Sequence, residues 1–123
     1  MNLGASSASR SVKNLEASRR FYARLGFVPV AGCREENGSI LGEGDQVVGV
    51  FQSLFERNTL TFNPGWDPQG NDTEAFTDVR QLREALGSSG VPLTTEVAPD
   101  TTGPGSIVVL DRDRNAVLID RHR

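Results

Sequence analysis

The two halves of this sequence repeat one order of expected structural elements, and this repetition limits the possible folds more than any other feature. Each half has the residue spacing of a strand, then a helix, then three short strands separated by turn residues. The helices are expected over about 15–25 and 78–88. The expected strands are 7–12, 27–32, 38–42, 46–52, 58–63, 92–97, 105–110 and 116–120. The pattern predicts one α+β domain over 1–123, made of two βαβββ modules at about 1–52 and 58–123.

Local signals mark the beginning of both helices. Asn14 is the expected N-cap of the first helix, and Asp78 with Gln81 three residues later predicts a capping box at the second. Pro29 has no N–H to donate, so its strand is expected at an edge of the sheet. The apolar stripe expected on the buried side of the second helix is Val79, Leu82 and Leu86.

The composition excludes several classes of protein. With 37% hydrophobic residues and 13 Gly, the chain has the apolar share of an ordinary globular domain. Cys33 is the single cysteine, which excludes an intramolecular disulfide and a cysteine-based zinc cluster. Two interpretations of Cys33 stay open: a nucleophilic thiol paired with His122, the single histidine, or a small packed residue.

The charge distribution narrows the expected partners. The formal net charge is −3, and the 13 basic residues are spread from Arg10 to Arg123 without a basic block. This argues against nucleic acid and against a membrane surface as partners. No stretch approaches the roughly 20 apolar residues of a membrane-spanning helix, and the first residues lack the apolar core of a signal peptide. We therefore expect a cytoplasmic protein.

Two segments carry a family resemblance: VKNLEASRRFYARLGF at 12–27 and VVLDRDRNAVLIDRH at 108–122. Together they resemble the vicinal oxygen chelate superfamily, whose members include glyoxalase I, bleomycin-resistance proteins, fosfomycin-resistance enzymes and extradiol dioxygenases. The resemblance implies a curved, eight-stranded mixed sheet that forms a cup, with the helices on its outer face. Arg112 and Arg114 stand where the family's D-P-D-G-N turn has Pro and Gly, so Arg114 is expected in the left-handed conformation.

The resemblance also implies where a metal would bind. Members of the superfamily hold a divalent metal with His, Gln and Glu side chains on the inner face of the cup, and the metal acts as a Lewis acid. The matching positions in this sequence are Ser7, Thr59 and Leu118. Hydroxyls are weak neutral ligands and leucine has no ligand atom. We therefore expect no metal and no other cofactor, and a divalent metal only through an atypical site.

Alternation along the strands predicts which side chains line the cup. If Leu60 and Phe62 pack under a helix, the residues between and beside them face inward. The residues assigned to the inner face or its rim are Ser7, Ser9, Gln52, Thr59, Thr61, Asn63, Leu118 and Asp120. They indicate either a pocket for a small polar ligand or ordinary strand residues on a wetted face.

Asp120 and His122 are the candidate catalytic residues. Asp120 is interpreted either as a general base or as the ion-pair partner of Arg10 or Arg121. His122 is interpreted either as an acid–base group at the mouth of the cup or as a solvated residue near the end of the sequence.

The connection over 64–76 is the most informative irregular segment. Its length of about 13 residues is typical of a lid or a binding loop. Trp66, the single tryptophan, either stacks on a ligand or covers the core or a dimer contact. Asn63, where the strand meets this loop, is the first choice for a ligand-binding residue.

Three functional hypotheses follow. The favoured one is a small-molecule binding protein that lacks the usual metal triad and holds its ligand in a polar cup. The alternative is a glyoxalase-type lyase, isomerase or dioxygenase with an atypical site, and the third is an interaction module that has lost its ligand. A homodimer is expected because each half has exposed sheet edges and because the segment between the halves contains the apolar residues Leu54 and Phe55.

Overall fold

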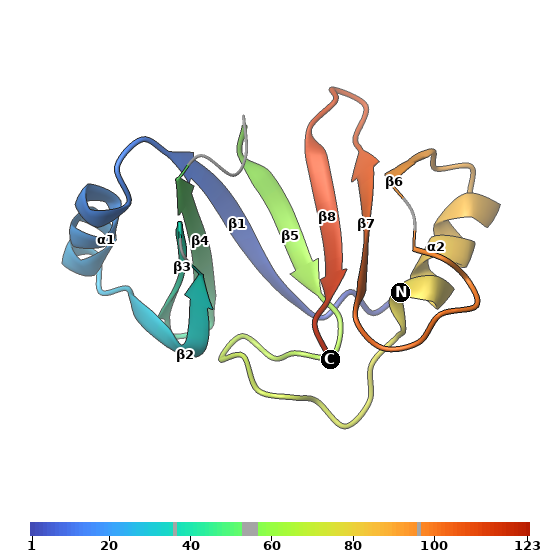
Figure 1. Ribbon diagram of the computed structural model, residues 1–123, viewed down its shortest axis with the longest axis horizontal. Helices are drawn as coiled ribbons and strands as arrows, with labels where there is room; N and C mark the ends of the chain where they lie inside the picture. Colours follow the sequence, from blue (N-terminus) through green and yellow to red (C-terminus); the bar gives the residue numbers. More distant parts are fainter. Residues whose placement is uncertain (36, 53–56, 96) are drawn as a thin grey trace.

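The chain folds into the expected order of strand, helix and three strands, twice over (Figure 1). The computed structural model describes residues 1–35, 37–52, 57–95 and 97–123, and within them every side chain outside 31–35. The first module consists of β1 (Ala5–Val12), α1 (Leu15–Arg24), β2 (Val28–Glu35), β3 (Gly38–Glu43) and β4 (Gln46–Gln52). The second consists of β5 (Thr59–Asn63), α2 (Val79–Ser88), β6 (Leu93–Thr95), β7 (Gly105–Leu110) and β8 (Ala116–Arg121).

All eight strands form one mixed sheet in the order β2-β3-β4-β1-β5-β8-β7-β6. The two modules meet at β1 and β5, which pair antiparallel from Ala5↔Asn63 to Ser9↔Thr59. Within each module the first strand pairs in parallel with the last one, β1 with β4 and β5 with β8. β2, which carries Pro29, lies at an edge as predicted. The sheet therefore joins both halves within a single chain.

Helix α2 covers the second module and supplies its core. Val79 and Leu82 are 0% and 1% exposed and pack with Ile107 and Ile119, so the predicted apolar stripe is confirmed. Leu86 and Phe62 pack against the same cluster. Gln81 Oε1 accepts a hydrogen bond from the Asp78 N–H at 3.1 Å, which fixes the first turn of the helix.

Helix α1 covers the first module but buries none of its own residues fully. Its predicted N-cap is confirmed, because Asn14 Oδ1 accepts from the Ala17 N–H at 3.0 Å. The sheet on that side is apolar, with Leu41 and Val50 almost completely buried. Phe21 and Leu25, by contrast, are 54% and 58% exposed.

One packing assumption was half wrong. Phe62 packs with the core under α2, but Leu60, two residues earlier on the same face of β5, is 44% exposed. The reason is its position: β5 lies at the middle of the sheet, while the helices lie at opposite sides (Figure 1).

The described residues contain no helix that is long and apolar enough to cross a membrane.

Two five-residue turns, 67–71 and 111–115, have the same hydrogen-bond pattern. In each, the side chain of the first Asp accepts from the backbone N–H groups two and four residues later, at 2.8 to 2.9 Å. The fourth residue of each is left-handed, Gly70 with φ +81° and Arg114 with φ 67°. The conformation predicted for Arg114 is confirmed. The sequence DPQGN at 67–71 is nearer to the D-P-D-G-N pattern than DRDRN, a similarity that the sequence analysis missed.

Candidate functional site

A row of buried hydroxyls lies at the centre of the sheet, on the face away from the helices. Ser7, Ser9 and Thr61 are 8%, 4% and 7% exposed, and Ser9 Oγ lies 2.8 Å from Thr61 Oγ1. The register places Ser7 opposite Thr61, and Thr61 opposite Leu118 in β8. Alternate residues of β5 and β8, Phe62 and Ile119, point to the α2 core instead. The predicted division of these strands into two faces is therefore observed.

A second group of side chains gathers where β5 and β8 end. Because these strands are parallel, their carboxyl ends meet at one edge of the sheet (Figure 1). Asn63 Nδ2 donates to the Asp120 carbonyl oxygen at 2.9 Å, and His122 Nε2 lies 3.0 Å from Asp120 Oδ2. The imidazole of His122 stacks on the indole of Trp66, with ring centroids 4.6 Å apart and planes 4° from parallel. We refer to Asn63, Trp66, Asp120 and His122 as the strand-end cluster.

The partners of Asp120 and His122 differ from both simpler interpretations. Asp120 pairs with His122, not with Arg10 or Arg121, because residues 120 and 122 point to the same side whereas Arg121 points to the opposite side. His122 is 40% exposed at its side chain, yet it is held between a carboxylate and an aromatic ring, so it is not a solvated tail residue. This arrangement can orient an imidazole for proton transfer.

The long connection 64–76, which we call the strap, leaves the strand-end cluster and runs to the first module. Trp66 forms an isolated β-bridge with Asp72, and its Nε1–H donates to Asp72 Oδ1 at 3.2 Å. Gln69 Nε2 donates to the Gly44 carbonyl oxygen at 3.2 Å and to Asp45 Oδ1 at 3.1 Å, both in the β3–β4 turn. The strap therefore connects the two modules at one end of the sheet.

A recess of about 330 Å³ lies beside the strap, between the start of β1 and the β3–β4 turn. Its volume is at the lower end of the range for small-molecule sites. Trp66 belongs to both this recess and the strand-end cluster. The recess is lined by Asn2, Gly4, Ala5, Ser6, Asp45, Gly65, Trp66, Pro68, Thr73, Ala75 and Phe76.

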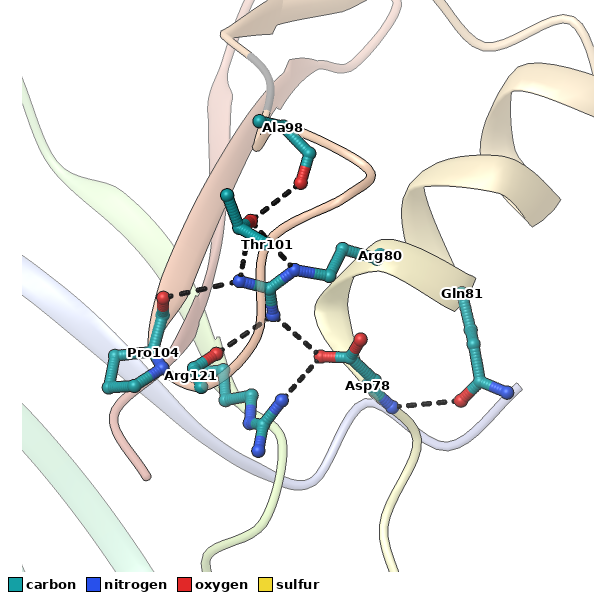
Figure 2. A network of polar contacts seen from close by, with 8 residues as sticks. Asp78, Arg80, Gln81, Ala98, Thr101, Pro104 and Arg121 are labelled. Carbon is teal, nitrogen blue, oxygen red and sulfur yellow. Dashed lines mark hydrogen bonds and ion pairs between the residues drawn. The ribbon is translucent and has the colours of Figure 1, made fainter.

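An ion-pair network lies at the start of α2 and includes Arg121, the residue between Asp120 and His122 in the sequence (Figure 2). Asp78 Oδ1 accepts from Arg121 Nη1 at 2.7 Å and from Arg80 Nη1 at 3.0 Å. Arg80 is 8% exposed and also donates to Thr101 Oγ1 and the Gly103 carbonyl oxygen. Burial opposes ionisation of Asp78, but the hydrogen bonds and charges of the two arginines outweigh it and hold the pKa of this carboxyl below its usual value.

The structure corrects one assignment to the inner face. Gln52 Oε1 accepts from the Leu15 N–H at 2.9 Å and so helps to begin α1. The register pairs Gln52 with Val12, which lies three residues after the inward-facing Ser9 and therefore on the opposite face of β1. The side chain of Gln52 accordingly points to the helix side. The side chain of Cys33 and the whole of Leu54 and Phe55 lie outside the described residues, and with them the proposed thiol pair and dimer contact.

Comparisons with known proteins identify the architecture. No protein-family model matches the sequence, and no curated protein shows significant sequence similarity to it. A chain from Legionella pneumophila, described as an NAD-dependent benzaldehyde dehydrogenase, matches with TM-score 0.68 at 15% identity over 96% of this chain and 99% of that one. A glyoxalase/bleomycin resistance protein/dioxygenase superfamily member from Vibrio splendidus matches with TM-score 0.60 at 13% identity, over 94% and 97%. The chain has the vicinal oxygen chelate fold.

A methylmalonyl-CoA epimerase solved in complex with methylmalonyl-CoA and NH4+ is also similar to this chain in fold. It matches with TM-score 0.63 at 13% identity, over 99% of this chain and 96% of that one. At these identities the similarity establishes the fold. The resemblance found in segments 12–27 and 108–122 is therefore confirmed at that level.

The ligand positions implied by the vicinal oxygen chelate fold do not suit a divalent metal in this chain. Ser7 and Thr59 offer neutral hydroxyls, and Leu118 offers no ligand atom. In the parts of the chain that the structure describes, no three His, Cys, Asp or Glu side chains are grouped closely enough to share a metal ion. The hydroxyls of Ser7 and Thr59 can donate and accept hydrogen bonds, and the Leu118 side chain offers an apolar contact.

Proposed function

We propose that this protein binds a small molecule in the cup of its sheet through hydroxyl groups, without a metal. The observation that carries the proposal is the Ser9–Thr61 pair, two buried hydroxyls 2.8 Å apart on the central strands. Each hydroxyl has one donor and two acceptor sites, so the mutual hydrogen bond leaves further capacity for a ligand. A ligand with a carbonyl or hydroxyl group suits this row, and Ser7 extends it by one position along β1.

The strand-end cluster supports a second candidate function, proton transfer to or from the bound ligand. The observation that favours it is the 3.0 Å contact between Asp120 Oδ2 and His122 Nε2. A carboxylate that fixes an imidazole is a common arrangement for general acid–base catalysis. In this alternative His122 moves the proton, Asp120 orients the ring, and the protein is an isomerase or lyase without a metal.

The proposal is tested by metal analysis and ligand binding together. Elemental analysis of purified protein should find far less than one zinc, nickel, manganese or iron per chain. A thermal-shift screen with small neutral carbonyl compounds, small acids, thiol conjugates and antibiotics should then find a stabilising ligand. About one tightly bound metal per chain, or no stabilising compound in any class, would contradict the proposal.

Matched serine variants place the ligand once one is found. Ser9→Ala and Thr61→Val should each weaken binding about threefold to tenfold, the effect of losing one hydrogen bond. Ser88→Ala is the control, because Ser88 is exposed at the end of α2, on the other side of the sheet from the hydroxyl row. Equal affinity in Ser9→Ala, Thr61→Val and Ser88→Ala would remove the hydroxyl row from the site. Asp120→Asn separates the two functions. If the protein transfers a proton, this variant should bind the ligand with unchanged affinity but lose turnover.

A further inference from the structure

The single tryptophan and the single histidine of the chain are stacked on each other. Trp66 belongs to the strap, and His122 follows β8, so the stack fastens a connecting segment to the sheet. The rings are nearly parallel and 4.6 Å apart, which gives a direct face-to-face contact. Any change in the charge of His122 therefore acts directly on the attachment of the strap.

The charged groups around this stack have defined partners. Asp120 Oδ2 lies 3.0 Å from His122 Nε2 on the side of β8. On the side of the strap, Asp72 accepts from the indole N–H of Trp66 and lies 3.8 Å from Arg123 Nε. Arg121 points away to Asp78 on the helix side. Asp120 is therefore a charged group in direct contact with the imidazole, and its negative charge favours imidazolium.

We propose that the Trp66–His122–Asp120 stack is a proton-controlled latch that holds the strap against the sheet. When His122 is protonated, its imidazolium forms an ion pair with Asp120 and a cation–π contact with the indole of Trp66. Deprotonation leaves a neutral imidazole that is hydrogen-bonded to the Asp120 carboxylate and stacked on the indole, and both contacts are weaker than those of the imidazolium. The strap is therefore held tightly at acidic pH and more loosely as the pH rises through the titration of His122.

Other contacts also hold the strap: the Ala5 N–H of β1 donates to the Trp66 carbonyl oxygen at 3.1 Å, and Arg123 Nη1 donates to the Gly65 carbonyl oxygen at 3.4 Å. The latch adds a contact that depends on pH to these contacts. Gln69 makes its two hydrogen bonds to the β3–β4 turn, and Gly70 lies against Val30. Because Gly65, Trp66, Pro68 and Thr73 line the recess, movement of the strap changes access to it. The latch is independent of the proposed ligand and can be tested without one.

Fluorescence of Trp66 reports the state of the latch without a label. Contact with an imidazolium quenches indole emission, so emission of the folded protein should rise in one step between pH 5 and pH 8.5, with a midpoint in the range of histidine. His122→Gln should remove this step, which also separates it from titration of the terminal amine. Asp120→Asn should keep the step but move its midpoint to lower pH, because the imidazolium loses its carboxylate. The same step in His122→Gln would overturn the proposal.

Hydrogen exchange measures the strap itself. The Thr73 N–H donates to the Gly65 carbonyl oxygen at 2.9 Å within the strap. After correction for intrinsic exchange, its protection should fall about threefold to tenfold from pH 5.5 to pH 8.5, as for loss of a half-exposed ion pair and a cation–π contact. In Asp120→Asn and Trp66→Ala this fall should be much smaller, while amides of α2 serve as the internal control. Protection that is independent of pH in the natural sequence, or that rises with pH, would refute the latch.

Discussion

The two helices have the same length and well-formed N-termini, yet they relate to the sheet in different ways. α2 buries Val79 and Leu82 in an apolar cluster and Arg80 in an ion-pair network. α1 buries no residue fully, and both Phe21 within it and Leu25 at its C-cap are more than half exposed. One module plan, used twice, has thus produced a helix with buried side chains in the second half and a helix without fully buried side chains in the first.

This difference indicates where stability and chemistry are concentrated. The strand-end cluster lies at the ends of β5 and β8, which belong to the second module. Arg121, between Asp120 and His122 in the sequence, is held by Asp78 (Figure 2). α1 depends on backbone capping by Asn14 and Gln52 rather than on buried side chains. We expect α1 to open locally before the rest of the domain unfolds, because few buried contacts oppose that opening.

The largest effect is expected from truncating a leucine at each helix, Leu82 within α2 or Leu25 at the C-cap of α1. Leu82→Ala should lower the free energy of unfolding by about 2 to 5 kcal/mol, because a fully buried side chain is lost and a cavity remains. Leu25→Ala, at a 58% exposed site, should lower it by less than about 1 kcal/mol. Urea unfolding followed by circular dichroism measures both. Equal losses would remove the contrast between the two modules.

The next largest change in the free energy of unfolding is expected from breaking an ion pair at each helix. Asp78→Asn should lower the free energy of unfolding by about 2 kcal/mol, because the buried Arg80 loses its carboxylate partner. The loss should be smaller than for a fully buried pair, because Asp78 is partly exposed. Glu16→Gln, which breaks an exposed pair with Arg19 in α1, should change it by less than about 0.5 kcal/mol. A loss at Glu16 as large as that at Asp78 would show that α1 is held more firmly than its packing indicates.

The effect of Asp78→Asn has a pH dependence of known sign. The pKa of Asp78 is lowered in the folded protein, so its carboxylate stabilises the fold above the unfolded pKa of about 3.9. That contribution is lost as the pH falls through the lower, folded pKa. The difference in unfolding free energy between the natural sequence and Asp78→Asn should therefore shrink below about pH 4. Thermal unfolding between pH 2.5 and pH 7 measures this, and a difference that grows on acidification would contradict it.

The smallest change in the free energy of unfolding is expected from substitutions at the left-handed residues of the two related turns, 67–71 and 111–115. Arg114→Gly should raise the free energy of unfolding by about 0.5 to 1 kcal/mol, because glycine adopts a positive φ without strain. Gly70→Ala should lower it by about 1 kcal/mol, because a Cβ there is strained and would lie 3.4 Å from Val30 Cγ1 in the first module. Unfolding curves for both variants decide the point. Opposite signs are expected, and equal signs would show that the turns are not equivalent.

Most of the fold could be predicted from local signals in the sequence. Asn14, Gln81 and Pro29 act through their own backbone neighbourhood, and each was found in its predicted role. Leu60 was misplaced because alternation gives a face of the sheet and not the reach of a helix. Gln52 was misplaced because it ends a strand next to a helix N-terminus, where a capping contact competes with any inner-face role.

The candidate site was predictable in its residues but not in its contacts. Ser7, Ser9, Thr61, Asn63, Trp66, Asp120 and His122 were all singled out from the sequence. Nothing in the sequence indicated that Trp66 stacks on His122, because the two residues lie on different segments that meet only through the parallel pairing of β5 and β8. A signal that was overlooked is the DPQGN turn, which directs the strap after Trp66.

The pairing of β1 with β5 has a consequence for how the protein behaves on dilution. Because both modules contribute to the sheet from one chain, the hydroxyl row forms by an intramolecular step. The effective concentration of one module near the other is set by the short connection between them and not by the amount of protein in solution. A cup built from two chains would come apart at low concentration, whereas this one stays complete in a single molecule.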